Sequence, residues 1–221
     1  LSDWCSDVCS SDLIVVVKND DTYAPAKVRA LMDKWQEATF NYFYQGASPT
    51  GLAYEGNERG GVVTTGGTGF GIMALIAGSE RGFITRSQSA AQLQKIVRFL
   101  GKAERFKGVW SHWYNPDGTA HPFGDQVKTG DLIETGFLMA GLLTASEYFT
   151  QPNGVELEIR DSVASFWNTV NWNAYTNGQD YLYWLWYSQS NRYALPIRGW
   201  HEGWITYLLA LAAPAPHAIS L

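Results

Sequence analysis

Six stretches of this chain have helical periodicity, and they alternate between two kinds. In one kind, charged residues separate apolar residues that recur at helical spacing, whereas in the other nearly every residue is apolar or small. The half-polar stretches cover residues 26–45, 87–102 and 155–170, and the apolar stretches cover residues 69–77, 131–149 and 202–213. A helix that is apolar on all sides is normally buried. The alternation therefore predicts consecutive helical hairpins in two layers, with parallel apolar helices inside and parallel amphipathic helices outside.

The connections between these helices differ in length according to their direction. Links from an inner to an outer helix are short, at residues 78–86 and 150–154. Links from an outer to an inner helix are long, at residues 46–68, 103–130 and 171–201, and none shows strand-like alternation of useful length. Long loops in compact domains are more often functional than short ones. We therefore expect a functional site at the end where the inner helices begin.

Aromatic residues make up 14% of the chain, with 10 Trp and 12 Tyr, and many lie in the long links. Trp and Tyr offer a flat apolar face with a polar edge, which suits sugar rings, although they also pack the rims of large helical cores. Two of the three histidines in these links, His112 and His201, are equally consistent with substrate binding and with a hydrogen-bonded structural role. The predicted substrate-binding residues are Tyr54, Glu55, Trp110, His112, Trp113, Trp184, Trp186, Trp200 and His201.

Three carboxylates stand at the starts of inner helices: Asp131 and Glu134 at the second, and Glu202 at the third. A spacing of three residues puts Asp131 and Glu134 on one face of a helix. One interpretation is that they cap a core helix, because free N–H groups and the helix dipole favour anions in a first turn. The other is a glycosidase site, where one carboxyl protonates the leaving oxygen and another activates water or attacks the anomeric carbon. Convergence with the aromatic links favours the second interpretation.

Other chemistries have weaker support. The net charge of −5 comes without a basic stripe, which argues against a nucleic-acid partner, and no apolar run is long enough to span a membrane. The four histidines lack metal-ligand spacing, and no serine sits in a G-x-S-x-G elbow. The glycine-rich stretch 64–71 lacks the P-loop pattern. We expect that its backbone closely approaches a neighbouring helix or a sugar.

The first residues form a distinct segment. The two cysteines, Cys5 and Cys9, lie in the Ser/Asp-rich stretch 1–13, where a C-x3-C pair alone is a weak metal signal. Residues 8–13 look like the in-frame translation of a sequencing-library adapter. We therefore interpret residues 1–13 as non-native and take residues 14–221 as the domain to be considered.

Three segments together resemble a known family. They are residues 65–73 with the following Glu-Arg-Gly-Phe-Ile-Thr-Arg of 80–86, residues 130–143 with their Gly-Asp-Leu-Ile-Glu-Thr start, and the Gly-Trp-His-Glu of 199–202. They look like the bacterial endo-β-1,2-glucanases of glycoside hydrolase family 144 and the related glucoamylase-like proteins, from about Trp35 to the C-terminus. The resemblance implies an all-α fold of the (α/α)6-toroid type and inverting hydrolysis of β-1,2-glucan or its oligosaccharides. It also implies that no cofactor is needed and that the protein is periplasmic or secreted.

The resemblance also suggests roles for the acids. Asp131, Glu134 and Glu202 match essential acids of the family, with Glu202 expected as general acid and the other two preparing the water or holding the sugar. The family usually carries acidic and glycine residues just before this motif, whereas here Val127-Lys128-Thr129 removes one acid and brings a base near Asp131. A carbohydrate-binding toroid without catalysis is the alternative.

The number of hairpins is the second departure from the family. The sequence provides about three, whereas the toroid needs six. We therefore interpret the chain as the N-terminal half of such a domain, and we expect its inner helices to expose apolar surface.

Overall fold

The computed structural model describes residues 26–57, 60–123 and 127–220. Its internal contacts divide the chain after Gln36, within helix α3 (Ala26–Tyr44). Of the first unit, the described residues 26–36 are the beginning of this helix. The second unit carries the remaining elements and is the subject of the following paragraphs. The predictions for Cys5, Cys9 and residues 1–13 lie outside the described residues.

The described residues are mostly helical and contain little sheet. Each of the six predicted helices is present. Besides α3, they are α4 (Thr65–Glu80), α5 (Arg86–Leu100), α6 (Leu132–Tyr148), α7 (Gly154–Trp167) and α8 (Trp204–Ala212). Two boundaries differ from expectation in ways that matter for the site. Helix α4 begins at Thr65 and so includes the glycine-rich stretch, and α8 begins at Trp204, which leaves Glu202 in the preceding turn.

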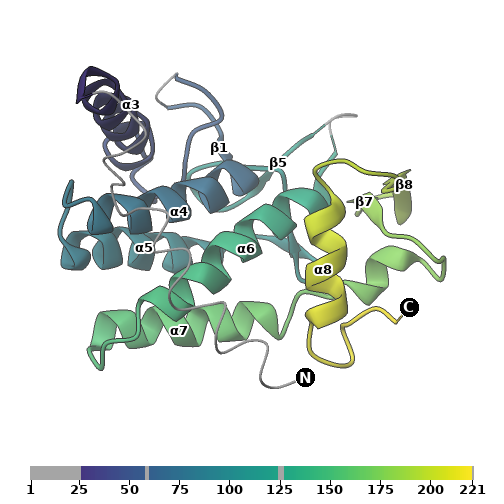
Figure 1. Cartoon of the computed structure of the whole chain (residues 1–221). Coiled ribbons are helices and arrows are strands. Elements are labelled where there is room, and N and C mark those ends of the chain that lie inside the picture. The colour runs from purple at the N-terminus through teal and green to yellow at the C-terminus, as the bar shows by residue number, and fades with distance from the viewer. Residues whose placement is uncertain (1–25, 58–59, 124–126, 221) are drawn as a thin grey trace. The chain divides into compact units, whose positions relative to one another are not determined.

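The helices form the two predicted layers. Helix α6 packs along α4 on one side and against α8 on the other, while α5 packs along α7 (Figure 1). The apolar helices α4 and α6 bury residues on several sides, whereas α5 buries one stripe and turns its charged residues outward. The prediction of an apolar inner layer and an amphipathic outer layer is confirmed for these helices.

The inner helices run in the same direction, as their pairwise contacts show. Along α4 and α6, the N-terminal Gly66 meets Glu134, and Gly69 lies against the backbone of Phe137 and Leu138. Along α6 and α8, Ile133 lies against Gly203, and Gly136 lies against Thr206. In each pair of helices, the contacting residue numbers increase together, so the two helices are parallel. The starts of α4, α6 and α8 therefore lie at one end of the layer, as predicted.

Short antiparallel strands fill the long links, where the sequence analysis expected none. In the described part of the chain they form three small sheets, in the orders β1-β4-β5, β2-β3 and β6-β7-β8. The strands are β1 (Val63–Thr64), β2 (Arg105–Phe106), β3 (Val109–Trp110), β4 (Trp113–Tyr114), β5 (Ala120–His121), β6 (Thr129–Asp131), β7 (Tyr183–Tyr187) and β8 (Arg192–Pro196). Most have only two residues, which is too short to show a two-residue period.

The outer layer is fixed by a buried ion pair. Arg86, at the start of α5, donates to both carboxylate oxygens of Glu156 in α7 (2.9 Å each) and to the carbonyl of Tyr148 at the end of α6 (2.7 Å). Glu156 is buried, and its carboxylate also accepts the backbone N–H of Gln151. This pair therefore joins the two hairpins at the end opposite the starts of the inner helices.

Some inner-helix surface stays uncovered by the described residues. Phe70 and Met73 of α4 and Trp204, Leu208 and Leu211 of α8 are exposed, as expected for the inner helices. No helix in the described ranges combines the length and the apolarity that a membrane crossing requires.

The close approach of α4 and α6 depends on glycine at residue 69. A methyl group there would collide with the carbonyl of Phe137 in the facing helix. We expect Gly69→Ala to lower the free energy of unfolding by about 2 kcal/mol, because overpacking against backbone forces the helices apart. Urea denaturation monitored by circular dichroism measures this change.

Gly154→Ala is the matched control. Nothing lies within 4 Å of the methyl position at this first residue of α7. Because the unfolded chain loses freedom, this substitution should stabilise the protein by about 0.5 kcal/mol. Equal effects of the two alanines would show that the contact of α4 with α6 does not limit packing.

Candidate functional site

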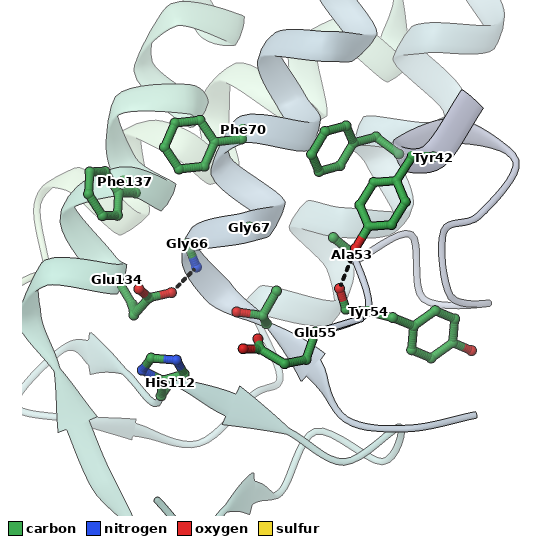
Figure 2. A pocket seen from close by; sticks show the side chains of 12 residues that line it. Tyr42, Ala53, Tyr54, Glu55, Gly66, Gly67, Phe70, His112, Glu134 and Phe137 are labelled. Atoms are coloured by element: carbon green, nitrogen blue, oxygen red, sulfur yellow. Dashed lines mark hydrogen bonds between the residues drawn. The ribbon is translucent and has the colours of Figure 1, made fainter. Parts of the chain in front are cut away.

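A pocket opens at the N-terminal ends of α4 and α6, within the second unit. Its volume is about 280 Å³, and Figure 2 shows side chains entering it from both helices, from the link before α4 and from the link before α6. The lining residues are Tyr42, Phe43, Ala53, Tyr54, Glu55, Thr64, Gly66, Gly67, Phe70, His112, Glu134 and Phe137. The pocket therefore combines two carboxylates and an imidazole with several aromatic rings.

Glu134 is the carboxylate at the centre of this pocket. It lies in the first turn of α6, and its Oε2 accepts the backbone N–H of Gly66 in α4 at 2.8 Å (Figure 2). Burial, and then the negative charge of Asp131, raises the pKa of Glu134 above its ordinary value. The imidazole of His112 and the Gly66 N–H act in the opposite direction, and Glu55 adds to the increase. Such a carboxyl holds its proton to higher pH than an exposed glutamate.

Asp131 lies directly behind the pocket and is 0% exposed. It ends β6 and caps α6, with Oδ1 accepting the N–H of Glu134 (3.0 Å) and the indole N–H of Trp184 in β7 (2.8 Å). Its Oδ2 accepts Nδ1–H of His112 (2.8 Å), since a carboxylate can only accept. The capping interpretation of Asp131 is confirmed. The same carboxylate also orients a pocket residue.

His112 faces the pocket beside Glu134 (Figure 2). Its ring stacks on Phe123 with centroids 4.3 Å apart, and its Nδ1 is held by Asp131, which leaves Nε2 for a ligand. Burial alone lowers the pKa of His112, but the hydrogen bond and charge of Asp131, with the charges of Glu134 and Glu55, outweigh it. The pKa of His112 therefore lies above its ordinary value, and a positive charge is favoured next to Glu134.

Glu55 enters the pocket from the link before α4. Figure 2 shows its carboxylate pointing toward Glu134 and His112. Its backbone N–H donates to the carbonyl of Val62 (3.2 Å), which closes the turn beside β1. The pocket thus presents carboxylates from two separate chain segments to one space.

Four aromatic residues of the pocket were not predicted, namely Tyr42, Phe43, Phe70 and Phe137. Phe70 of α4 and Phe137 of α6 line it and contact each other, with ring centroids 5.3 Å apart. Phe137 lies three residues after Glu134, on the same face of α6, so helical spacing is the signal that identifies it. The sequence analysis assigned both rings to the apolar core, as it did the remaining apolar residues of these helices.

The predicted tryptophans occupy different positions. Trp113 packs against His112 and Phe123, and Trp184 holds Asp131. Trp186, on the same strand as Trp184, donates to Asn191 (3.0 Å) and is not among the pocket residues. Trp110 is 0% exposed; its indole donates to the carbonyl of Leu100 (3.2 Å), so it lies in the core and does not reach a ligand in the pocket.

The remaining predicted residues lie in the turn before α8. Glu202 has a side chain that is 56% exposed, and its nearest charged partner is His201 at 3.8 Å. Trp200 is 87% exposed and stacks on Trp204, with centroids 5.4 Å apart. This turn lies at the same end of the inner layer as the pocket, because Gly203 contacts Ile133 in the first turn of α6. None of its residues lines the Glu134 pocket.

Lys128 does not approach Asp131, although the sequence placed it nearby. Its ammonium group binds Glu104 at 2.7 Å, and Glu104 also accepts the N–H of Ala120 (2.8 Å). In the described part of the chain, no group of histidine, cysteine and acidic side chains could hold a metal ion.

Comparison with known proteins identifies relatives of this arrangement. An exo-β-1,2-glucooligosaccharide sophorohydrolase from Parabacteroides distasonis is 44% identical over 87% of this chain, although the match covers only 28% of that protein. The predicted resemblance to bacterial β-1,2-glucanases is confirmed. No family model matches the chain.

Solved structures of two glucanases share the fold. An endo-β-1,2-glucanase from Chitinophaga pinensis, in complex with sophorotriose and glucose, is 41% identical with a TM-score of 0.78, covering 86% of this chain and 48% of its own. A β-1,2-glucanase from P. distasonis is 42% identical with a TM-score of 0.80, covering 89% of this chain and 29% of its own. The chain thus spans half or less of these relatives.

The Asp131–His112 pair can be tested through the imidazole. We expect Asp131→Asn to lower the pKa of His112, because an amide keeps the hydrogen-bonding position without the negative charge. The NMR shift of the His112 ring protons as a function of pH measures this change. Asp117→Asn, at an exposed aspartate that binds Thr119, should leave the His112 titration unchanged. An unchanged His112 titration in the Asp131 variant would contradict the ion pair.

Proposed function

We propose that this chain carries part of the active site of a glycoside hydrolase acting on β-1,2-linked gluco-oligosaccharides. The observation that carries the proposal is Glu134, a largely buried carboxyl with a raised pKa, set among aromatic rings in an open pocket. Hydrolysis of a glycosidic bond needs such a group, because the leaving oxygen must receive a proton. The similarity to β-1,2-glucan hydrolases supports the choice of linkage.

The architecture we propose is half of an (α/α)6 toroid. Two layers of hairpins with parallel inner helices are consistent with it, and so is the coverage of about half of the Chitinophaga structure. In this proposal, the exposed apolar side chains on α4 and α8 face the remaining helices of the complete domain.

Glu134 is the proton donor in this mechanism, in place of the Glu202 expected from the sequence. Its protonated carboxyl donates to the glycosidic oxygen as the bond to the anomeric carbon breaks. His112 and Glu55 lie beside it and bind sugar hydroxyls, while Phe70 and Phe137 offer apolar faces to the ring. Asp131 does not touch the sugar; it positions His112 and the first turn of α6.

The second carboxylate of the mechanism is Glu202. An inverting enzyme needs a general base about 6.5–9.5 Å from the acid, with room for one water between them. Glu202 lies at the same end of the inner layer and is exposed, so that it is accessible to water. Inversion therefore requires the turn before α8 to face the Glu134 pocket across the bound sugar.

Substrates with different leaving groups separate the two roles. We expect Glu134→Gln to lower the rate on β-1,2-gluco-oligosaccharides by about 100- to 10,000-fold. The same variant should retain most of its activity on a glucosyl fluoride, whose leaving group needs no proton. Glu202→Gln should lose activity on both substrates, because water activation is needed for each. Initial rates on the natural and activated substrates measure the difference.

The reverse pattern, in which Glu202→Gln keeps its activity on the glucosyl fluoride and Glu134→Gln loses it, would identify Glu202 as the general acid. Tight oligosaccharide binding without turnover by the unsubstituted chain would favour the alternative of a carbohydrate-binding toroid.

The charges around Glu134 predict two opposite pH shifts. A general acid must be protonated, so activity falls as pH rises through its pKa. Glu55→Gln removes a charge that raises the pKa of Glu134, and we expect the alkaline limb of kcat/KM to move to lower pH. His112→Asn removes a charge that lowers this pKa while keeping a donor for Asp131, so the limb should move to higher pH. Shifts of the same sign in both variants would exclude Glu134 as the group that titrates.

A further inference from the structure

A second pocket adjoins the Glu134 pocket and has no role in the chemistry above. Its volume is about 250 Å³, and it lies between the end of α3 and the link that follows. It shares Tyr42 and Tyr54 with the first pocket. Its complete lining is Asn41, Tyr42, Gln45, Gly46, Tyr54, Gly56 and Asn57.

The border between the two pockets is built by two tyrosines. The hydroxyl of Tyr42 donates to the backbone carbonyl of Tyr54 (3.3 Å), which joins the end of α3 to the link. Figure 2 shows the Tyr54 ring turned away from Glu134, on the opposite side of its backbone from the carboxylates. Tyr54, which the sequence analysis placed at the substrate, therefore offers its ring to the second pocket.

The lining of the second pocket has a consistent chemical character. The described lining residues supply three primary amides and two phenol groups, and none of them is charged. Asn41 lies in the last turn of α3, and Gln45 directly follows the helix with its N–H still bonded to the carbonyl of Asn41 (3.0 Å), so the two residues lie one helical turn apart. In the described part of the chain, the side chains of Asn41, Gln45 and Asn57 make no hydrogen bond to another residue. Their donors and acceptors are thus available to a ligand.

These groups suit a neutral ligand with many hydroxyls. A primary amide both donates and accepts, as a hydroxyl does, and a tyrosine ring offers an apolar face with a polar edge. Among the described lining residues, no cation is present to bind a phosphate or carboxylate ligand, and no carboxylate is present to bind a metal ion. Each pocket alone is smaller than the range of about 300–1,000 Å³ typical of drug-sized ligands, whereas the two joined fall within it. The size therefore suits one sugar unit per pocket.

We propose that the pocket of Asn41, Gln45 and Asn57 is a second glucosyl-binding subsite, which holds a sugar unit of the same oligosaccharide beyond the unit at Glu134. This inference rests on the proposed function, since it assigns the neighbouring part of the same substrate. It makes chain length a determinant of affinity: an oligosaccharide long enough to pass the Tyr42–Tyr54 border gains the amide contacts, and a shorter one does not.

The test compares oligosaccharide lengths in a variant that cannot turn them over. In the Glu134→Gln background, calorimetry gives the dissociation constants of glucose and of β-1,2-linked di-, tri-, tetra- and pentasaccharides. We expect affinity to rise at the length that reaches the second pocket. Adding Asn41→Ala and Gln45→Ala should remove this increase, weakening binding of the longer sugars by about tenfold and leaving the shorter sugars unchanged.

Controls keep this result separate from folding. Alanine is favourable in the helix at residue 41, and residue 45 is exposed in the turn that follows, so the double substitution should keep the thermal unfolding midpoint. Gln151→Ala, in the link between α6 and α7 and outside both pockets, should leave every dissociation constant unchanged. The side-chain amide signals of Asn41 and Gln45 should shift on adding the trisaccharide or a longer sugar.

Two outcomes overturn the subsite. One is a double variant that binds all lengths as its parent does, and the other is a parent that binds no β-1,2-linked oligosaccharide. Failure of the proposed function looks different. A chain without hydrolytic activity that still shows the length-dependent loss would keep the subsite as a carbohydrate site and remove only the catalysis.

Discussion

Three segments that are far apart in the sequence meet on one buried carboxylate. Asp131 accepts the backbone N–H of Glu134, the indole N–H of Trp184 and Nδ1–H of His112, so it joins the start of α6 to β7 and to the link before β4. A carboxylate without access to water needs donors in place of the solvent, and the three bonds supply them. The cap fixes the first turn of α6, which directs Glu134 into the pocket, and the third bond sets the imidazole beside it. The geometry of the pocket follows from this interaction.

The same carboxylate sets the charges of the pocket. Its negative charge makes Glu134 harder to ionise and His112 easier to protonate, so it acts on both neighbours without lining the pocket. Both shifts are upward, so each group keeps its proton to higher pH than in water, which suits proton donation to an oxygen. Hence Asp131 has a structural role and an electrostatic role through the same bonds, and the two interpretations of the sequence do not exclude each other.

The layers could be predicted because a helix that is apolar on all sides is normally buried between other elements. The meeting of Gly66 with Glu134 followed from that arrangement, since parallel inner helices bring their starts together. The strands of the links could not be predicted, because a two-residue strand is too short to show a period and is defined only by its pairing partner. Strand β1, for example, is defined by the pairing of Thr64 with Trp113 in β4. The roles of single aromatic residues were also hidden. Trp110 and Trp184 have similar contexts in the sequence, yet one packs in the core and the other holds Asp131, because tertiary contacts decide which indole is enclosed.

The glycine-rich start of α4 is the other half of the site. The first N–H groups of a helix have no partner within the helix and attract anions. The sequence analysis expected the backbone of this stretch to approach a neighbouring helix or a sugar closely. Here it approaches helix α6, and the N–H of Gly66 binds the Glu134 carboxylate. A side chain at residue 66 would occupy the place of that carboxylate, so the position of the acid depends on this glycine, as the close packing of α4 on α6 depends on Gly69. The bond also stabilises the ionised form and limits the rise of the Glu134 pKa. A proton donor needs both properties, since burial lets it keep the proton until the glycosidic oxygen takes it and the helix start stabilises the carboxylate that remains.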